Sequence, residues 1–235
     1  VVIVCTPNNP TGPAVTQSEL DSFISKLPSH VVVVVDEAYL EFVRMADPVD
    51  GLALLRSHPN VVLLRTFSKA YGLAGFRVGY AVAPAPLAAA LRAVSLPFGV
   101  SHVAQAAAVA SLAAQDELFE RVEDLVARRA DLVARLREVG WDLPEAQGNF
   151  VWFPLGDRAV DFAAACAEAG VPDASASPEI ERPGPLRPAR RGPPPGRDVP
   201  AQEDGEEGLV VRCQLSIVRR SVWVRRCGGA ISGRT

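Results

Sequence analysis

Lys69 stands in the segment of the sequence that is richest in reactive side chains. Ser68 precedes it directly, and Arg77 follows eight residues later. The chain has only two lysines, and one that lies inside Ser-Lys-Ala-Tyr-Gly-Leu-Ala-Gly is unlike an ordinary solvated surface lysine. A lysine amine can form a Schiff base with an aldehyde and can carry a proton, while hydroxyl and guanidinium groups bind phosphate oxygens. The segment therefore offers both an imine-forming group and phosphate-binding groups.

Further polar groups lie upstream of this lysine. Asn9 belongs to the run Asn-Asn-Pro-Thr-Gly, Asp36 and Tyr39 belong to Asp-Glu-Ala-Tyr, and Thr66 adds a hydroxyl two residues before Ser68. Asn-Pro and Thr-Gly are common turn dipeptides, but the five-residue run is far less generic. Taken alone, Asp36 reads as an aspartate that ends a strand, and Tyr39 reads as a packed aromatic residue. Their combination with Lys69 favours a functional interpretation.

Short apolar runs alternate with helical patterns along the first 170 residues. Five consecutive valines, Val31–Val35, indicate a strand that is buried on both faces. Thr16 and Glu19 have the spacing of a capping box at the start of a helix. This alternation predicts an α/β fold with a parallel or mixed sheet. The expected strands are Val1–Cys5, Val31–Val35, Val61–Leu64, Phe76–Val82 and Asn149–Phe153, and the expected helices are 16–27, 50–56, 86–95, 101–114, 116–139 and 160–169.

The polar residues follow the expected strands in a regular way. Asn9, Asp36 and the segment 66–69 each come at or just after the end of one strand. In an open α/β sheet, ligands bind beyond the carboxyl ends of the strands. We therefore expect these three segments to converge on one edge of the sheet.

The composition excludes several kinds of partner. The net charge is -3, and no dense Lys/Arg face lies within the first 170 residues, so nucleic acid is not expected as a ligand. No run of eighteen apolar residues could span a membrane. The four cysteines have no C-x-x-C spacing, so we expect neither a metal site nor a disulfide framework. A cytoplasmic protein with small-molecule ligands is the expectation.

Together these motifs resemble the fold-type-I pyridoxal phosphate (PLP) aminotransferases of the class I/II group. Within that group the resemblance is to histidinol-phosphate and aromatic amino acid aminotransferases. The runs Leu64–Gly79, Leu96–Ser101 and Asn149–Trp152, with Ala104-Gln105, are most similar to the aromatic, or phenylalanine, subgroup. The resemblance covers residues 1–170.

The resemblance implies PLP as the cofactor and a role for each polar residue. Lys69 is implied to be the catalytic lysine that forms the Schiff base, and Asp36 to be the partner of the pyridine nitrogen. The donors to the phenolic oxygen are implied to be Asn9 and Tyr39, and the phosphate ligands to be Thr66, Ser68 and Arg77.

The resemblance also implies a reaction. Such enzymes are homodimers that exchange an amino group between an aromatic amino acid and 2-oxoglutarate. One alternative is a histidinol-phosphate aminotransferase of histidine biosynthesis, which shares the same scaffold. Others are a non-catalytic PLP-binding regulatory module and an inactive truncated product.

We expect three regions along the chain. Residues 1–100 would form part of a PLP-binding large domain with three α/β/α layers, incomplete because a chain that opens on Val1 suggests a fragment. Residues 101–170 would contain interdomain helices and the start of a small C-terminal α+β domain. Residues 171–235 are rich in Pro, Gly and Arg, and we expect them to be disordered or the product of a shifted reading frame. No arginine in that tail matches the family's substrate-carboxylate arginine.

Overall fold

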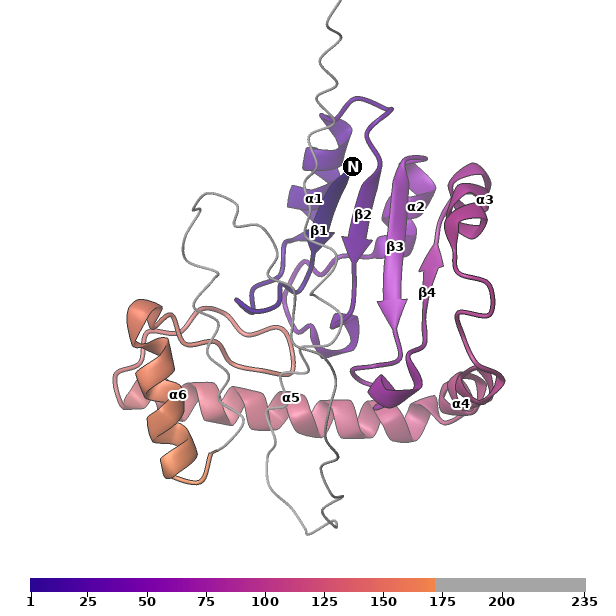
Figure 1. Cartoon of the computed structure of the whole chain (residues 1–235). Helices are drawn as coiled ribbons and strands as arrows, with labels where there is room; N and C mark the ends of the chain where they lie inside the picture. Colours follow the sequence, from indigo (N-terminus) through magenta and orange to yellow (C-terminus); the bar gives the residue numbers. More distant parts are fainter. Residues whose placement is uncertain (172–235) are drawn as a thin grey trace, which may run out of the picture. The chain divides into compact units, whose positions relative to one another are not determined.

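Four strands form one sheet in the described part of the chain, which is residues 1–171 of a computed structural model. They lie in chain order across the sheet (Figure 1). The first three are parallel, and the fourth is antiparallel to the third. The strands are β1 (Val2–Cys5), β2 (Val33–Asp36), β3 (Val61–Thr66) and β4 (Gly79–Val82). The expected mixed α/β sheet is confirmed.

Two helices cover one face of this sheet, α1 (Gln17–Ser25) and α2 (Gly51–Ser57). Their apolar residues pack on alternate strand residues, because successive side chains of a strand point to opposite faces. The core beneath them contains Leu20, Ile24, Val33, Val35, Leu54, Val61 and Leu63. The expected capping box is present: Thr16 accepts from the backbone of Glu19, and the Glu19 carboxylate accepts from the backbone of Thr16.

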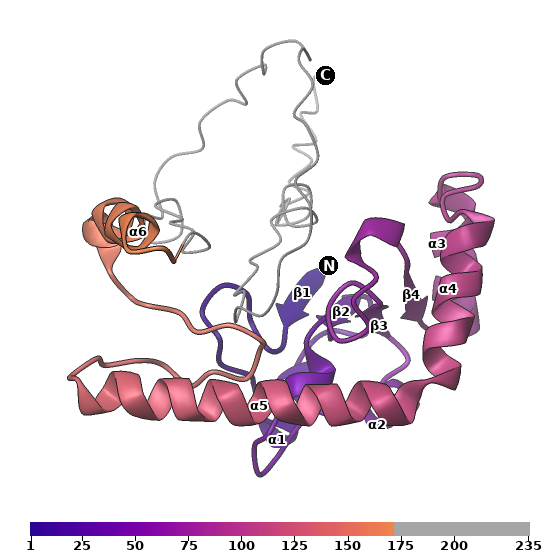
Figure 2. The ribbon, with the colours of Figure 1, turned by 90° about the horizontal axis from the view of Figure 1, so that it is seen from below.

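The long helix α5 runs across the edge at which β1, β2 and β3 end (Figures 1 and 2). Leu118 and Val122 of α5 are buried against Tyr39 and Phe42. Tyr39 directly precedes the short 3₁₀ helix η1, and Phe42 is its last residue. The carboxyl edge of the sheet is therefore partly covered by a helix from later in the chain. The bounds are η1 Leu40–Phe42, α3 Ala85–Val94, α4 His102–Ala113 and α5 Gln115–Glu138.

The chain divides into two compact units, and residues 154–171 belong to the second. Their elements are η3 (Gly156–Arg158) and α6 (Ala159–Glu168). Within residues 1–171, no helix is both long and apolar enough to cross a bilayer. The tail expected to be disordered or frame-shifted lies outside the described residues, apart from its first residue. The boundaries expected at residues 100 and 170 stay a prediction.

The strand expected over Phe76–Val82 begins later than the sequence indicates. Ala74–Phe76 is a 3₁₀ helix, η2, and Arg77 follows in the left-handed conformation with φ 54° and ψ 47°. A residue in that conformation interrupts the regular extended backbone of a strand. β4 therefore starts at Gly79, which pairs with Thr66.

The strand expected over Asn149–Phe153 is wrong, because this run forms no strand in the structure. Its aromatic rings pack individually. Phe150 meets Tyr39 edge-on at 5.3 Å between centroids, and Phe153 meets Trp141 at 5.0 Å. Ring packing takes the place of the backbone pairing that a strand would need.

Candidate active site

Two turns and one strand end bring the expected polar residues to the carboxyl edge of the parallel strands. Asn9 lies in the turn after β1, Asp36 is the last residue of β2, and Lys69 lies in the turn after β3. Asp36 stands in register with Cys5, the last residue of β1, and with Leu64, and β3 continues two residues further to Thr66. The convergence expected from the strand ends is present.

The ring of Tyr39 is the point at which two of these turns meet. The Asn9 side-chain amide donates to the Tyr39 hydroxyl at 2.6 Å. The Lys69 Nζ lies 5.0 Å from the centroid of the same ring, within range of a cation–π contact. Tyr39 is buried, and Phe150 packs on its edge. Because its oxygen accepts from Asn9, the Tyr39 hydroxyl keeps its own proton to donate elsewhere.

Asp36 is a half-buried carboxylate beside this cluster. Its Oδ1 accepts from the Ala38 backbone N–H at 3.0 Å. Burial raises the pKa of Asp36, while the Ala38 N–H and the charge of Lys69 act in the opposite direction. A carboxylate in such a poorly solvated position gains stability from each additional cation or charged N–H donor. The site is therefore suited to hold a positively charged group next to Asp36.

Hydroxyl groups line the turn that carries Lys69. Thr66 Oγ1 accepts from the backbone N–H of Ser68 at 3.1 Å, and both residues are half-buried. Gly79 lies opposite Thr66, and a Cβ at this position would come within 2.8 Å of the Arg65 carbonyl oxygen. Glycine thus allows the close approach of β4 to the strand end that holds these hydroxyls.

Arg77 lies near the same edge, and its side chain bonds the backbone of its own loop. The residue is exposed, and its guanidinium donates to the carbonyl oxygen of Ala74 at 2.7 Å. Its chain neighbour Val78 accepts a backbone hydrogen bond from Phe67, which follows Thr66. The backbone of Arg77 is therefore close to the hydroxyl-bearing turn, although its side chain bonds the Ala74 carbonyl oxygen.

A segment that the sequence analysis overlooked supports the turn of Asn9. The backbone N–H of Gln147 donates to the carbonyl oxygen of Gly12 at 3.0 Å. The buried Gln147 side chain accepts from the Arg44 backbone N–H at 2.6 Å. These partners are more than 100 residues apart, and no local pattern around Gln147 indicates the contact.

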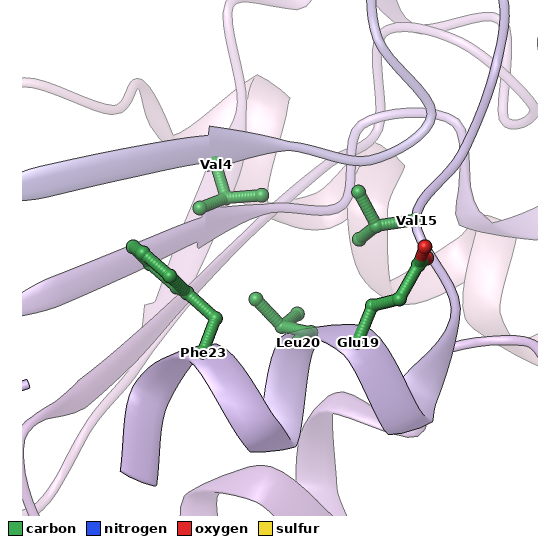
Figure 3. Close-up of a pocket in the computed structure, with 5 residues that line it drawn as sticks. All are labelled: Val4, Val15, Glu19, Leu20 and Phe23. Carbon is green, nitrogen blue, oxygen red and sulfur yellow. The ribbon is translucent and has the colours of Figure 1, made fainter. Parts of the chain in front are cut away.

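An open apolar groove lies elsewhere, between β1 and α1 (Figure 3). It has a volume of about 360 Å³, and the residues that line it are Val4, Val15, Glu19, Leu20 and Phe23. None of the seven expected site residues is among them. Within residues 1–171, no group of three or more His, Cys, Asp or Glu side chains is placed to hold a metal ion.

The family model for class I and II aminotransferases matches residues 1–178. The chain belongs to this family. It is 60% identical over 171 residues to an aromatic amino acid aminotransferase of Streptomyces avermitilis, a match that covers 73% of this chain and 48% of that protein. It is 54% identical over 171 residues to the protein of the same name from Mycobacteroides abscessus, with 73% and 49% covered. The chain thus spans about half the length of the curated relatives it matches.

A solved structure of the family has the same fold. The histidinol-phosphate aminotransferase of Sinorhizobium meliloti, solved in complex with pyridoxal-5'-phosphate, matches with a TM-score of 0.64 and 34% sequence identity. The match covers 73% of this chain and 46% of that one. The four-stranded, mostly parallel sheet is therefore an aminotransferase sheet.

Proposed function

We propose that this chain carries the cofactor site of a PLP-dependent aminotransferase that moves an amino group between an aromatic amino acid and 2-oxoglutarate. The observation that carries the proposal is the cluster at the sheet edge, where Asn9 and Lys69 meet on the ring of Tyr39 beside Asp36. The aromatic substrate class is supported by the 60% identity to the S. avermitilis protein. Histidinol phosphate is the second candidate, favoured by the structural likeness to the S. meliloti enzyme.

The residues present fit PLP in charge and in donor type. Asp36 is a poorly solvated carboxylate with one cation nearby, which suits a protonated ring nitrogen. Asn9 and Tyr39 present donors to an oxygen, and Thr66 and Ser68 present hydroxyls at the same edge. When bound, PLP supplies an aldehyde that condenses with an amine with loss of water, and a pyridine ring that takes up electrons from the substrate's α carbon.

Each residue then has a task that follows from its place. Lys69 would hold the cofactor's aldehyde carbon through its Nζ, and the same amine, once free, would take up the proton that leaves the substrate's α carbon. Asp36 would keep the proton on the ring nitrogen. Tyr39, oriented by Asn9, would donate a hydrogen bond to the phenolic oxygen.

The phosphate is assigned to the turn after β3. The hydroxyls of Thr66 and Ser68 would donate to its oxygens, and the Arg77 guanidinium, which now bonds the Ala74 carbonyl oxygen, would add further N–H donors. Residues 1–100 correspond on this proposal to part of a three-layer large domain, and residues 101–170 lead into a small C-terminal α+β domain. The complete protein acts as a homodimer on small-molecule substrates, and the cytoplasmic location stays a prediction.

A labelling experiment tests the cofactor assignment directly. The chain is titrated with PLP, reduced with borohydride, and digested for peptide mass spectrometry. We expect the pyridoxyl group on Lys69, and its loss together with the visible absorption in Lys69→Ala. Lys26→Ala is the matched control, because Lys26 is the only other lysine and is exposed at the end of α1. Labelling of Lys26 instead, or full absorption in Lys69→Ala, would refute the assignment.

The substrate class needs a separate measurement. Amino transfer to 2-oxoglutarate is followed with phenylalanine, tyrosine and histidinol phosphate as donors. Faster transfer from the aromatic donors supports the proposal, and preference for histidinol phosphate supports the second candidate. Labelled Lys69 without transfer from any donor would favour a cofactor-binding product that lacks catalysis.

A further inference from the structure

A buried ion pair joins the ends of β2 and β3 next to the candidate site. Glu37 is 2% exposed, and its Oε2 accepts from the Arg65 guanidinium Nε at 2.7 Å. The backbone N–H of Glu37 also donates to the carbonyl oxygen of Leu64. Side chain and backbone of one residue thus bind the neighbouring strand at two successive positions.

The pair lies on the core face of the sheet. Side chains two residues apart in a strand point to the same face, so Glu37 continues the buried row of Val33 and Val35. Arg65 continues in the same way the row of Val61 and Leu63. The charged pair therefore occupies the next position in each of these two rows of buried apolar residues.

Each member of the pair is the chain neighbour of a residue in the candidate site. Glu37 follows Asp36, and Arg65 precedes Thr66. Since successive side chains alternate between faces, Asp36 and Thr66 point to the face opposite the ion pair. The Glu37–Arg65 bond on the other face of these two strands thus links the chain neighbours of Asp36 and Thr66 and adds to the backbone pairing there.

Other groups enclose the pair. Gly51, at the start of α2, stands so close that a Cβ there would collide with the Glu37 carboxylate. Burial raises the pKa of Glu37, while the hydrogen bond and charge of Arg65 lower it. Burial also raises the pKa of Glu41, which the charge of Arg65 lowers and that of Glu37 raises. Tyr80 of β4 is the register partner of Arg65 in the sheet.

Stability alone does not account for such a pair. Replacing a buried ion pair by apolar residues of similar volume is often neutral or stabilising, because two charges lose their hydration on burial. We infer that Glu37 and Arg65 are positioning residues, which hold Asp36 and the Thr66 turn at the spacing that a phosphorylated pyridine ligand requires. The inference rests on the proposed function, because it assigns that ligand to the edge.

The test compares a variant that breaks the ion pair with a double variant that replaces both charged residues by apolar ones, so that an effect on PLP binding can be distinguished from an effect on stability. Glu37→Gln is expected to weaken PLP binding by about 10-fold, in line with the 10–100-fold losses seen when supporting residues of bound metals are removed. Glu37→Met combined with Arg65→Met restores an apolar core, so its melting temperature should return to the wild-type value or exceed it. PLP binding by this double variant should stay about 10-fold weaker. Binding at the wild-type level would overturn the inference.

A conservative variant and a matched control complete the design. Arg65→Lys keeps the positive charge but loses the planar guanidinium group with its several N–H donors. The affinity of this variant for PLP should lie between that of the wild type and that of Glu37→Gln. Asp21→Asn removes the negative charge of the carboxylate that lies 2.8 Å from the His58 ring nitrogen, at the amino end of β3. It should lower the melting temperature without changing PLP binding. A loss of affinity in Asp21→Asn equal to that in Glu37→Gln would assign the effect to general destabilisation and refute the inference.

Amide hydrogen exchange of the cofactor-free chain gives a second readout. The Ala38 N–H bonded to Asp36 and the Ser68 N–H bonded to Thr66 report on the two positions. Glu37→Gln should speed exchange at both, and Asp21→Asn at neither. If the wild-type chain fails to bind PLP, the proposed function fails, and exchange alone then decides the positioning role. Unchanged exchange in Glu37→Gln would refute it.

Discussion

Tyr39→Phe removes one hydroxyl from the centre of the candidate site and leaves the ring in place. The ring keeps its contacts with Phe150 and with the Lys69 ammonium, so the aromatic packing is retained. What is lost is the 2.6 Å hydrogen bond from Asn9. Asn9 is half-buried, so its amide can bond water in place of Tyr39. The expected loss in the free energy of unfolding is therefore about 1 kcal/mol, near the average for one hydrogen bond. For a chain of this size that lowers the melting temperature by roughly 2–4 °C.

The same variant should change how the bound cofactor titrates. On the proposed function, the Tyr39 hydroxyl donates to the phenolic oxygen and stabilises its negative charge. Hydrogen bonds to charged groups contribute about 1.5–3 kcal/mol. Loss of the donor should therefore move the pH midpoint of the visible absorption upward by roughly one to two units, at 1.36 kcal/mol per unit.

Tyr71→Phe is the control that distinguishes the two effects. The Tyr71 hydroxyl accepts from the Gln115 side chain at 3.1 Å, and its ring packs on Phe67 at 4.8 Å. This variant loses a comparable hydrogen bond, so we expect a similar fall in melting temperature with no change in the absorption midpoint. An unchanged midpoint in Tyr39→Phe would show that Tyr39 does not contact the phenolic oxygen.

Three further changes test other parts of the site. Burial raises the pKa of Asp36, so the ionised carboxylate destabilises the cofactor-free fold at neutral pH. Asp36→Asn should therefore raise the melting temperature at neutral pH. This rise in melting temperature should disappear as the pH falls to about 4, the ordinary pKa of an aspartate in the unfolded chain. Gly79→Ala places a Cβ 2.8 Å from the Arg65 carbonyl oxygen and should cost about 1–3 kcal/mol in urea unfolding, whereas Gly75→Ala, which meets nothing within 4 Å, should cost less than about 1 kcal/mol. Gln147→Ala removes the two hydrogen bonds between the buried Gln147 side chain and the Arg44 backbone and should cost about 2 kcal/mol, and a loss below about 0.5 kcal/mol would contradict this account.

The strands around the site could be predicted because their signals are local. Val31–Val35 and Val61–Leu64 read as strands from composition alone, and both are strands to within two residues. Thr16 marks a helix start through its own side chain and that of Glu19. The edge on which Asn9, Asp36 and Lys69 converge then follows from the rule for parallel sheets.

The remaining features depend on contacts that a local pattern does not contain. The run at 149–153 is apolar enough for a strand, but its rings pack on Tyr39 and Trp141 instead. The bond between Glu37 and Arg65 joins residues 28 apart, and only the period-two rows of buried residues could have indicated it. The later start of β4 depends on the left-handed conformation of Arg77, which the apolar and aromatic residues around it do not indicate.

The order of the strands has a consequence for how the protein is made. Val2 pairs with Val33 and Val33 pairs with Val61, so every parallel pairing closes a loop of about 30 residues. Each strand can therefore pair with the previous one once it has been synthesised, and domains generally form from the N-terminal side during translation. All seven expected cofactor ligands precede residue 78, whereas the helix that buries Tyr39 begins at Gln115. The cofactor edge can thus assemble on the ribosome while it is still open, and α5 covers it only after a further forty or so residues have been synthesised.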